Sequence, residues 1–177
     1  MLGAASALFL RDKKAFVAVR SILQARTDLA HHSMVVSLLS VGLAKQVLGS
    51  DTTALIHAGL AGLLHDVGRI GHEDDVEDGE HVRRGAELLV KADVPRPVLD
   101  AVAMHHERMD GSGYPLRLRG PSIAMLGRLV GLVDTFATIY SEQKTRVGVF
   151  DALRILAEVY RGCFDDQIAV ALVRLFR

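Results

Sequence analysis

Several histidines and aspartates of this chain stand where an apolar side chain is expected. His65 and Asp66 form an adjacent pair at the end of the apolar run GLAGLLHD, and His32 lies near the front of another apolar run. A lone buried charge is costly unless it is paired, bound to a metal or neutralised by a shifted pKa. These positions therefore need partners that their own segments do not supply.

The same anomaly recurs further along the chain. His105 and His106 follow the apolar stretch AVAM, and Asp134 interrupts RLVGLVDTF. Imidazole and carboxylate groups together suit borderline transition metals such as iron, manganese or zinc, and not calcium or magnesium alone. One metal site would account for all of these residues at once.

Each residue taken alone also has a simpler interpretation. A histidine on an apolar helix is often a core residue with an ordinary hydrogen-bond partner. Asp66 could end a helix or cap the next turn, and Asp134 could pair with an arginine such as Arg128. Because the adjacent pairs and the intrahelical aspartate would each need a separate explanation, a shared metal site is favoured.

The elements that must position these residues are helices. Apolar residues recur with helical spacing almost throughout, and sustained alternation typical of strands is missing. The predicted helices cover residues 29–48, 52–66, 95–107, 121–140, 150–161 and 166 onward. The apolar first ten residues are interpreted as the start of a further packed helix, since a membrane span needs about 20 apolar residues. The sequence predicts an all-α helical bundle of about seven helices in a single domain.

Local signals set several boundaries of these helices. Gly49 and Gly162 are predicted to end helices, because glycine accepts the left-handed conformation that follows a helix. Asp51, together with Ser50, and the pair Asp165-Asp166 are suited to cap the following helices. The acidic stretch 72–80 and the glycine-rich stretch 110–115 are predicted loops.

Composition narrows the function classes. Lys and Arg number 21, as do Asp and Glu, so the formal net charge is zero and a nucleic-acid polymer is not an expected ligand. The single cysteine, Cys163, excludes an internal disulfide framework and suits a reducing cytoplasm. The N-terminal segment could alternatively mark the boundary with an upstream sensory domain.

The order of these residues resembles the HD-GYP domain, a branch of the HD phosphohydrolase superfamily. The matching motifs are His32, His65-Asp66-Val67-Gly68, His81, His105-His106-Glu107, Asp110-Gly111-Ser112-Gly113-Tyr114-Pro115 and Asp134. The stretch from His105 to Pro115 is the most specific part. The resemblance implies one HD-type domain over residues 1–177, with its core at about 28–164.

That resemblance implies a metal-dependent phosphodiesterase. Members hydrolyse cyclic di-GMP, to the linear dinucleotide or to GMP, and a metal-bridging hydroxide is the attacking group. Two transition-metal ions are expected, with iron as the first candidate and manganese as the second. Asp28 stands where members with three metals place a carboxylate, but aspartate is shorter than the usual glutamate there, which argues against a third ion.

Residue roles carry over by position. One metal is expected to bind His32, His65, Asp66 and Asp134, and Asp66 would bridge to a second metal at His81, His105 and His106. The catalytic residues implied are Asp66 and Arg69. The substrate-binding residues implied are Gly111, Gly113, Tyr114 and Arg146.

The chain departs from the family pattern around this set. Arg69 replaces the lysine usual in HD-x-G-K, and arginine presents a planar fork in place of a compact ammonium. Ala137 replaces a second aspartate, and Gln143 falls where an arginine is common, which leaves Arg146 as the candidate phosphate contact there. The acidic run 73–80 is predicted to be a solvated loop that would repel an anionic substrate.

These departures keep two other functions open. One is a signalling module that retains the metals without catalysis and binds cyclic di-GMP or a partner protein such as a diguanylate cyclase. The other is an HD-type hydrolase of a different phosphoester, because a motif does not determine the substrate. A homodimer and a sensory domain are possible partners under either interpretation.

Overall fold

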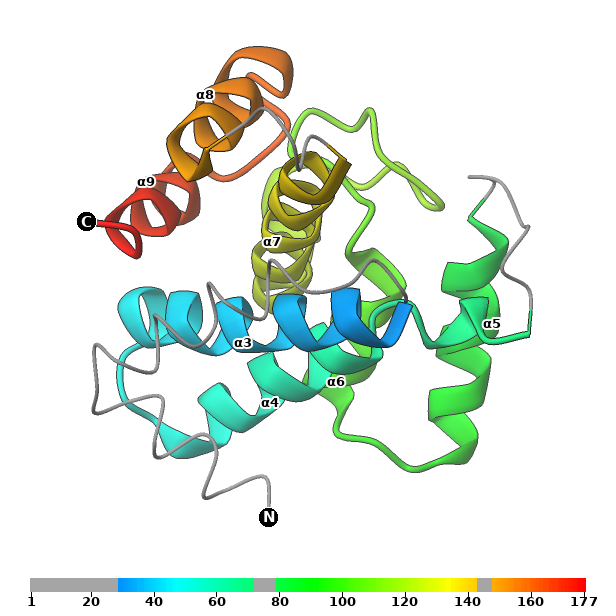
Figure 1. The fold of residues 1–177 in the computed structure, drawn as a ribbon. Coiled ribbons are helices and arrows are strands. Elements are labelled where there is room, and N and C mark those ends of the chain that lie inside the picture. Colours follow the sequence, from blue (N-terminus) through cyan, green and yellow to red (C-terminus); the bar gives the residue numbers. More distant parts are fainter. Residues whose placement is uncertain (1–28, 72–78, 143–147) are drawn as a thin grey trace.

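The computed structural model describes residues 29–71, 79–142 and 148–177, and within these ranges it is all-α without strands (Figure 1). The helices are α3 (Leu29–Leu48), α4 (Thr52–Leu64), α5 (Glu80–Lys91), α6 (Arg96–Met104), α7 (Met125–Glu142), α8 (Val149–Val159) and α9 (Asp166–Arg174). Two short 3-10 turns, η1 (Val67–Arg69) and η2 (Gly120–Ser122), lie between them. The all-α prediction is confirmed.

The helix boundaries follow the local signals of the sequence. Helix α3 ends at Leu48 and is followed by Gly49, whose φ of 84° lies in the left-handed region that glycine tolerates. The Asp51 side chain accepts hydrogen bonds from the first backbone N–H groups of α4, and Asp165 does the same for α9. These caps satisfy N–H groups that lack partners within the helix.

Helix α7 runs through the middle of the bundle (Figure 1) and contacts α3, α4, α6, α8 and α9. Its side chains Leu129, Val130, Val133 and Phe136 have no exposed surface, and they join α3 and α4 in one apolar core. Burial of such side chains removes apolar surface from water, which is the main favourable contribution to folding. Asp134 lies on this helix, so its carboxylate is carried into the interior.

Helix α5 was not among the helices that the sequence predicted. The helix begins at Glu80, inside the stretch predicted to be a loop, and the rest of that stretch, residues 72–78, lies outside the described residues. Its buried face consists of His81, Val82, Gly85 and Leu89, while the exposed side chains are both charged and apolar, among them Arg83, Glu87, Leu88, Val90 and Lys91. A single narrow apolar stripe in a strongly charged segment is a weaker signal than the apolar runs of the core helices.

The start of α7 also differs from the prediction. Pro121 and Ser122 belong to the 3-10 turn η2, and the helix itself begins three residues later, at Met125. Among the described residues no helix combines the length and apolarity that crossing a membrane requires. The N-terminal segment, for which a packed helix was predicted, lies outside the described residues.

Candidate metal centre

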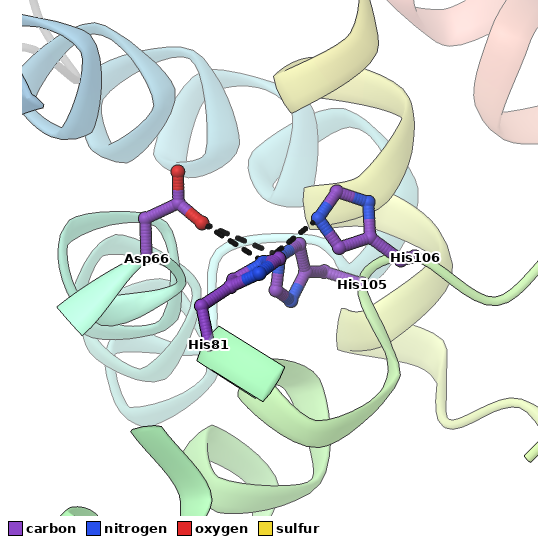
Figure 2. A group of neighbouring side chains, drawn as sticks. All are labelled: Asp66, His81, His105 and His106. Atoms are coloured by element: carbon purple, nitrogen blue, oxygen red, sulfur yellow. Dashed lines mark hydrogen bonds and ion pairs between the residues drawn. The ribbon is translucent and has the colours of Figure 1, made fainter. Parts of the chain in front are cut away.

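Seven histidine and aspartate side chains meet where α3, the end of α4, α5, the end of α6 and α7 converge. They form two groups, and in each the candidate ligand atoms lie within 4.8 Å of one another. The Asp66 group consists of Asp66, His81, His105 and His106 (Figure 2). The His32 group consists of His32, His65 and Asp134. Every metal ligand expected from the sequence is therefore in one of these groups.

Helix ends deliver most of these side chains. His65 directly follows α4, Asp66 precedes η1, His81 is the second residue of α5, and His105 directly follows α6. A residue at a helix end can point a polar side chain inward while the helix body keeps its apolar packing. Asp134 is the exception, since it projects from the middle of α7.

Two glycines allow these elements to come close. A Cβ atom on Gly68 in η1 would collide with the backbone carbonyl of His81 in α5. A Cβ atom on Gly131 in α7 would likewise collide with the carbonyl of His105. Any larger residue at either position would push a metal-ligand candidate away from the centre.

The two fully buried imidazoles have their free nitrogens aimed into the centre. His65 Nδ1 lies 2.8 Å from the Gly62 carbonyl, and His105 Nδ1 lies 2.8 Å from the Val102 carbonyl. Nδ1 therefore donates the ring proton in each case, and Nε2 keeps its lone pair. Both Nε2 atoms, and Oδ1 of Asp66, are buried without a hydrogen-bond partner. Buried polar atoms are rarely left in that state, and a bound cation would satisfy all three.

Asp66 lies between the two groups. Its Oδ2 is 3.5 Å from Nε2 of His65, while its Oδ1 is 3.3 Å from Nε2 of His81 and 3.8 Å from Nε2 of His105. One carboxylate oxygen therefore faces each group. The Arg69 Nε atom also lies 3.0 Å from Oδ1, so a guanidinium pairs with the same oxygen that faces the His81 and His105 imidazoles.

The His32 group is an ion-pair cluster. Asp134 Oδ1 lies 2.9 Å from His32 Nε2 and 3.6 Å from His65 Nε2. Burial would raise the pKa of Asp134, but its interactions with these imidazoles outweigh burial and hold that pKa well below the usual range. The possible pairing of Asp134 with Arg128 is wrong, because Arg128 forms an ion pair at 3.1 Å with Asp165.

The imidazoles of the Asp66 group are held neutral. Burial, followed by the nearby charge of His65, lowers the pKa of His105 to about 4. Burial also lowers the pKa values of His106 and His81. The Nε2 atoms of His81 and His106 face each other at 3.1 Å, so at most one of them carries a proton. Neutral imidazole is the form that binds a metal ion.

For His65, nearby carboxylates influence the pKa more than burial does. Burial lowers its pKa, but the carboxylates of Asp134 and Asp66 more than offset this and raise that pKa above the ordinary histidine value. The two buried histidines thus differ in charge preference because only one of them faces Asp134 closely.

Glu107 has a role that sequence reasoning did not assign. Its buried carboxylate accepts hydrogen bonds from the backbone N–H groups of Leu116, at 2.7 Å, and Leu118, at 2.8 Å. These two hydrogen bonds hold the end of the glycine-rich loop beside the candidate ligands His105 and His106. A glutamate directly after two candidate ligand histidines was the available signal, since a carboxylate in an apolar setting needs partners.

The glycine-rich loop packs against the ligand segment. A Cβ atom on Gly113 would collide with the backbone of residues 106–108, and the Tyr114 ring stacks on His106 with the ring centres 4.6 Å apart. Gly111 has a φ of 80° and lies against the Arg119 side chain. Packing alone accounts for both glycines, and substrate binding by this loop stays a prediction.

The other residues that the sequence singled out lie in different parts of the molecule. Ala137, which replaces a family aspartate, is 3% exposed and lies in the apolar core. Arg69 points at Asp66, as described above. Asp28 and Arg146 lie outside the described residues, so the expectation against a third metal and the expected phosphate contact of Arg146 both stay predictions.

Comparison with known proteins gives one family match. The family model described as an HD domain matches residues 21–168. A cyclic di-GMP phosphodiesterase of Pseudomonas aeruginosa is 33% identical over 96% of this chain and 44% of its own length. A 3′3′-cGAMP-specific phosphodiesterase of Vibrio cholerae is 27% identical over 81% of this chain and 34% of its own length. The chain spans less than half the length of these curated relatives.

One solved structure has the same fold. An HDG"Y"P protein from Bdellovibrio bacteriovorus superposes with a TM-score of 0.83 over 98% of this chain and 60% of its own length, at 22% identity. At this identity the likeness bears on the fold alone. It agrees with the helical arrangement that brings the two ligand groups together.

Proposed function

The chain belongs to the HD domain family, in its HD-GYP branch, and on this premise we propose that it hydrolyses a phosphodiester bond of cyclic di-GMP. In this reaction water adds to phosphorus and the bond from phosphorus to the ribose 3′ oxygen breaks. The observation that carries the proposal is the pair of adjacent candidate ligand groups, in which the buried Nε2 atoms of His65 and His105 have no hydrogen-bond partner.

The donor set fits two transition-metal ions. We propose that the His32 group with Asp66 holds one ion, and that Asp66 bridges to a second ion in the Asp66 group. When bound, such a pair lowers the pKa of a water molecule and neutralises charge on the phosphoryl oxygens. Five imidazoles and two carboxylates leave the centre net positive once both ions are bound, which suits an anionic substrate.

The chain's own residues would orient the reactants. His65 and His105 keep their lone pairs directed inward because their Nδ1 atoms are bonded to backbone carbonyls. We propose that Arg69 supplies a cation to the scissile phosphate, replacing the ammonium usual in the family. Gly111, Gly113, Tyr114 and Arg146 are proposed substrate contacts.

A direct assay tests the proposal. The protein is loaded with Fe(II) or with Mn(II), its metal content is measured, and cyclic di-GMP is followed by chromatography. The expected result is conversion to the linear dinucleotide or GMP, lost on chelation and restored by metal. Absence of turnover at two metals per chain would overturn the proposal and favour a metal-binding module without catalysis. Binding of the dinucleotide without its hydrolysis would further support that alternative.

A second candidate substrate is 3′3′-cGAMP. The 27% identity to a Vibrio cholerae phosphodiesterase specific for that dinucleotide favours its inclusion. The two dinucleotides differ in one base, so selectivity would come from contacts away from the phosphate. Parallel assays with both dinucleotides and with simple phosphoesters separate these possibilities, and exclusive turnover of a simple phosphoester would identify a different hydrolase.

Metal identity, location and partners are further parts of the proposal. Iron is proposed as the native metal and manganese as the second candidate, to be tested by elemental analysis of protein purified without added metal. We propose a cytoplasmic location, which suits a chain with one cysteine. A homodimer, a diguanylate cyclase partner and a sensory domain stay predictions, accessible to light scattering and pull-down experiments.

A further inference from the structure

The Arg108 side chain bonds to the segments that carry both ligand groups. Its guanidinium donates hydrogen bonds to the backbone carbonyls of His105, at 3.0 Å, and Glu107, at 3.1 Å. It also donates to the Thr135 hydroxyl at 3.3 Å, and its carbon lies 4.8 Å from the centre of the Phe164 ring. Arg108 therefore touches three separate parts of the chain.

These contacts join the two ligand groups. His105 belongs to the Asp66 group, whereas Thr135 directly follows Asp134 of the His32 group. Residues 108 and 135 come from the segment after α6 and from α7, which also meet where Gly131 faces the His105 carbonyl. A side chain at this junction can control how far the end of α6 lies from α7.

The chemistry of arginine suits this role. Its planar fork carries several donors in a rigid geometry and can hold two carbonyls and a hydroxyl at once, which a lysine ammonium on a flexible stem does not match. The Phe164 ring, from the turn between α8 and α9, covers one face of the guanidinium and limits its movement. The Thr135 hydroxyl is itself bonded to the Gly131 carbonyl at 2.8 Å.

We propose that Arg108 is a positioning residue that sets the separation between the Asp66 group and the His32 group. The inference rests on the metal centre of the proposed function but not on the identity of the substrate. Arg108 contacts the backbone of one candidate ligand and the neighbour of another, so it acts through them. Its loss moves the groups relative to each other without removing any ligand atom.

The test uses the full chain and Mn(II) alone, so no substrate is needed. Wild type is compared with Arg108→Lys and Arg108→Met by Mn(II) titration and by electron paramagnetic resonance of the loaded protein. We expect the second Mn(II) to bind about tenfold or more weakly in both variants, as for other residues that orient metal ligands. The spin-coupled signal of a close manganese pair, which depends on metal separation, is expected to change.

A second pair of variants covers the case in which Arg108 variants do not fold. Thr135→Val removes the hydroxyl that accepts from Arg108, and Thr135→Ser keeps it. The valine variant is expected to bind the second Mn(II) more weakly than wild type, and the serine variant is expected to bind it as wild type does. The matched control is Arg128→Met, because Arg128 is also a half-buried arginine, bonded to the Ile123 carbonyl and Asp165, but it contacts neither ligand group.

The outcomes separate this inference from the proposed function. Unchanged Mn(II) affinities and an unchanged manganese-pair signal in Arg108→Lys or Thr135→Val, with only a lower melting temperature, would overturn the positioning role. Equal losses of metal affinity in Arg128→Met would also overturn it. A wild type that binds two Mn(II) ions but leaves cyclic di-GMP intact would overturn the proposed function alone.

Discussion

The two ligand groups of the centre satisfy their polar atoms in different ways. In the His32 group, Asp134 pairs with His32 at 2.9 Å, and carboxylates raise the pKa of His65. In the Asp66 group, the His81 and His105 imidazoles share one carboxylate oxygen that Arg69 also contacts, and the pKa of His105 is lowered to about 4. The first group resembles a buried ion pair, while the second is a set of neutral donors.

The difference indicates what each group needs. A histidine–aspartate pair provides its own charge balance, so the protein itself pairs His32 with Asp134, while Nε2 of His65 in the same group lacks a hydrogen-bond partner. The Asp66 group has buried atoms, Nε2 of His105 and Oδ1 of Asp66, that lack hydrogen-bond partners. Its geometry therefore suits a cation, which would bind beside the Arg69 guanidinium that already lies 3.0 Å from Oδ1 of Asp66.

The largest effect is expected from the residue that both groups share. Asp66→Ala should weaken metal binding at both groups by at least roughly a hundredfold, since ligands matter more than the residues that orient them. Asp134→Ala should remove metal from the His32 group only. Elemental analysis after gel filtration measures this as metal per chain. Retention of one full metal ion by Asp66→Ala would contradict the proposed bridge.

The second-largest effect is expected on the stability of the metal-free protein, where a substitution in the His32 group should cost more than one in the Asp66 group. His32→Ala leaves the buried Asp134 carboxylate without its closest partner, and breaking such a pair costs about 3 kcal/mol. His106→Ala breaks no ion pair and should cost about 1–2 kcal/mol, typical of lost packing. Urea unfolding in a chelator measures both, with His57→Ala, outside both groups, as the control. A larger loss for His106→Ala would reverse the assignment of the self-paired group.

Acidification should destabilise the metal-free protein through the histidines of the Asp66 group. The lowered pKa values of His81, His105 and His106 mean that the unfolded chain takes up protons first. The free energy of unfolding of the metal-free protein should therefore fall as pH drops from about 6.5, the ordinary histidine value, to about 4, the pKa of His105.

His65 opposes this effect, because its raised pKa adds stability below the ordinary histidine value. Three lowered groups against one raised group still predict a net loss. Urea midpoints at pH 7, 6 and 5 in a chelator measure it, and His105→Gln should flatten the dependence. A midpoint that rises on acidification would show that the ion pairs of the His32 group dominate instead.

The smallest effect is expected from Arg69→Lys. Arg69 Nε lies 3.0 Å from Asp66 Oδ1, so its charge competes with a cation for that oxygen. Weakening this partly exposed pair is worth at most about 1 kcal/mol, or about a fivefold gain in metal affinity at the Asp66 group. Isothermal titration with Mn(II) measures it. An equal gain at the His32 group, or a loss at the Asp66 group, would contradict this competition.

Much of the fold was predictable because its signals are local. Apolar spacing gave the core helices, and Asp51 and Asp165 cap α4 and α9 as predicted. Helix α5 was missed because its apolar face is narrow and lies in a charged segment. The helix α7 boundary was shifted because proline at Pro121 also suits a 3-10 turn.

The candidate site was predictable in its members but not in its internal contacts. The motif order named all seven residues that the two ligand groups contain. The sequence did not determine which residue pairs with Asp134, and in the structure it is His32, 102 residues away. The clamp formed by Glu107 and the junction at Arg108 were not predicted, since each depends on backbone groups that face them only after folding.

The sequence by itself determined the helical segments other than α5 and named the side chains that could bind a metal, because helix caps, apolar spacing and motifs act over a few residues. Tertiary structure alone decided that His32 pairs with Asp134 and that Asp66 directs one oxygen to each group. It also decided which histidines are neutral, since burial and neighbouring charge govern the pKa of an imidazole. Those quantities arise only when distant helices pack.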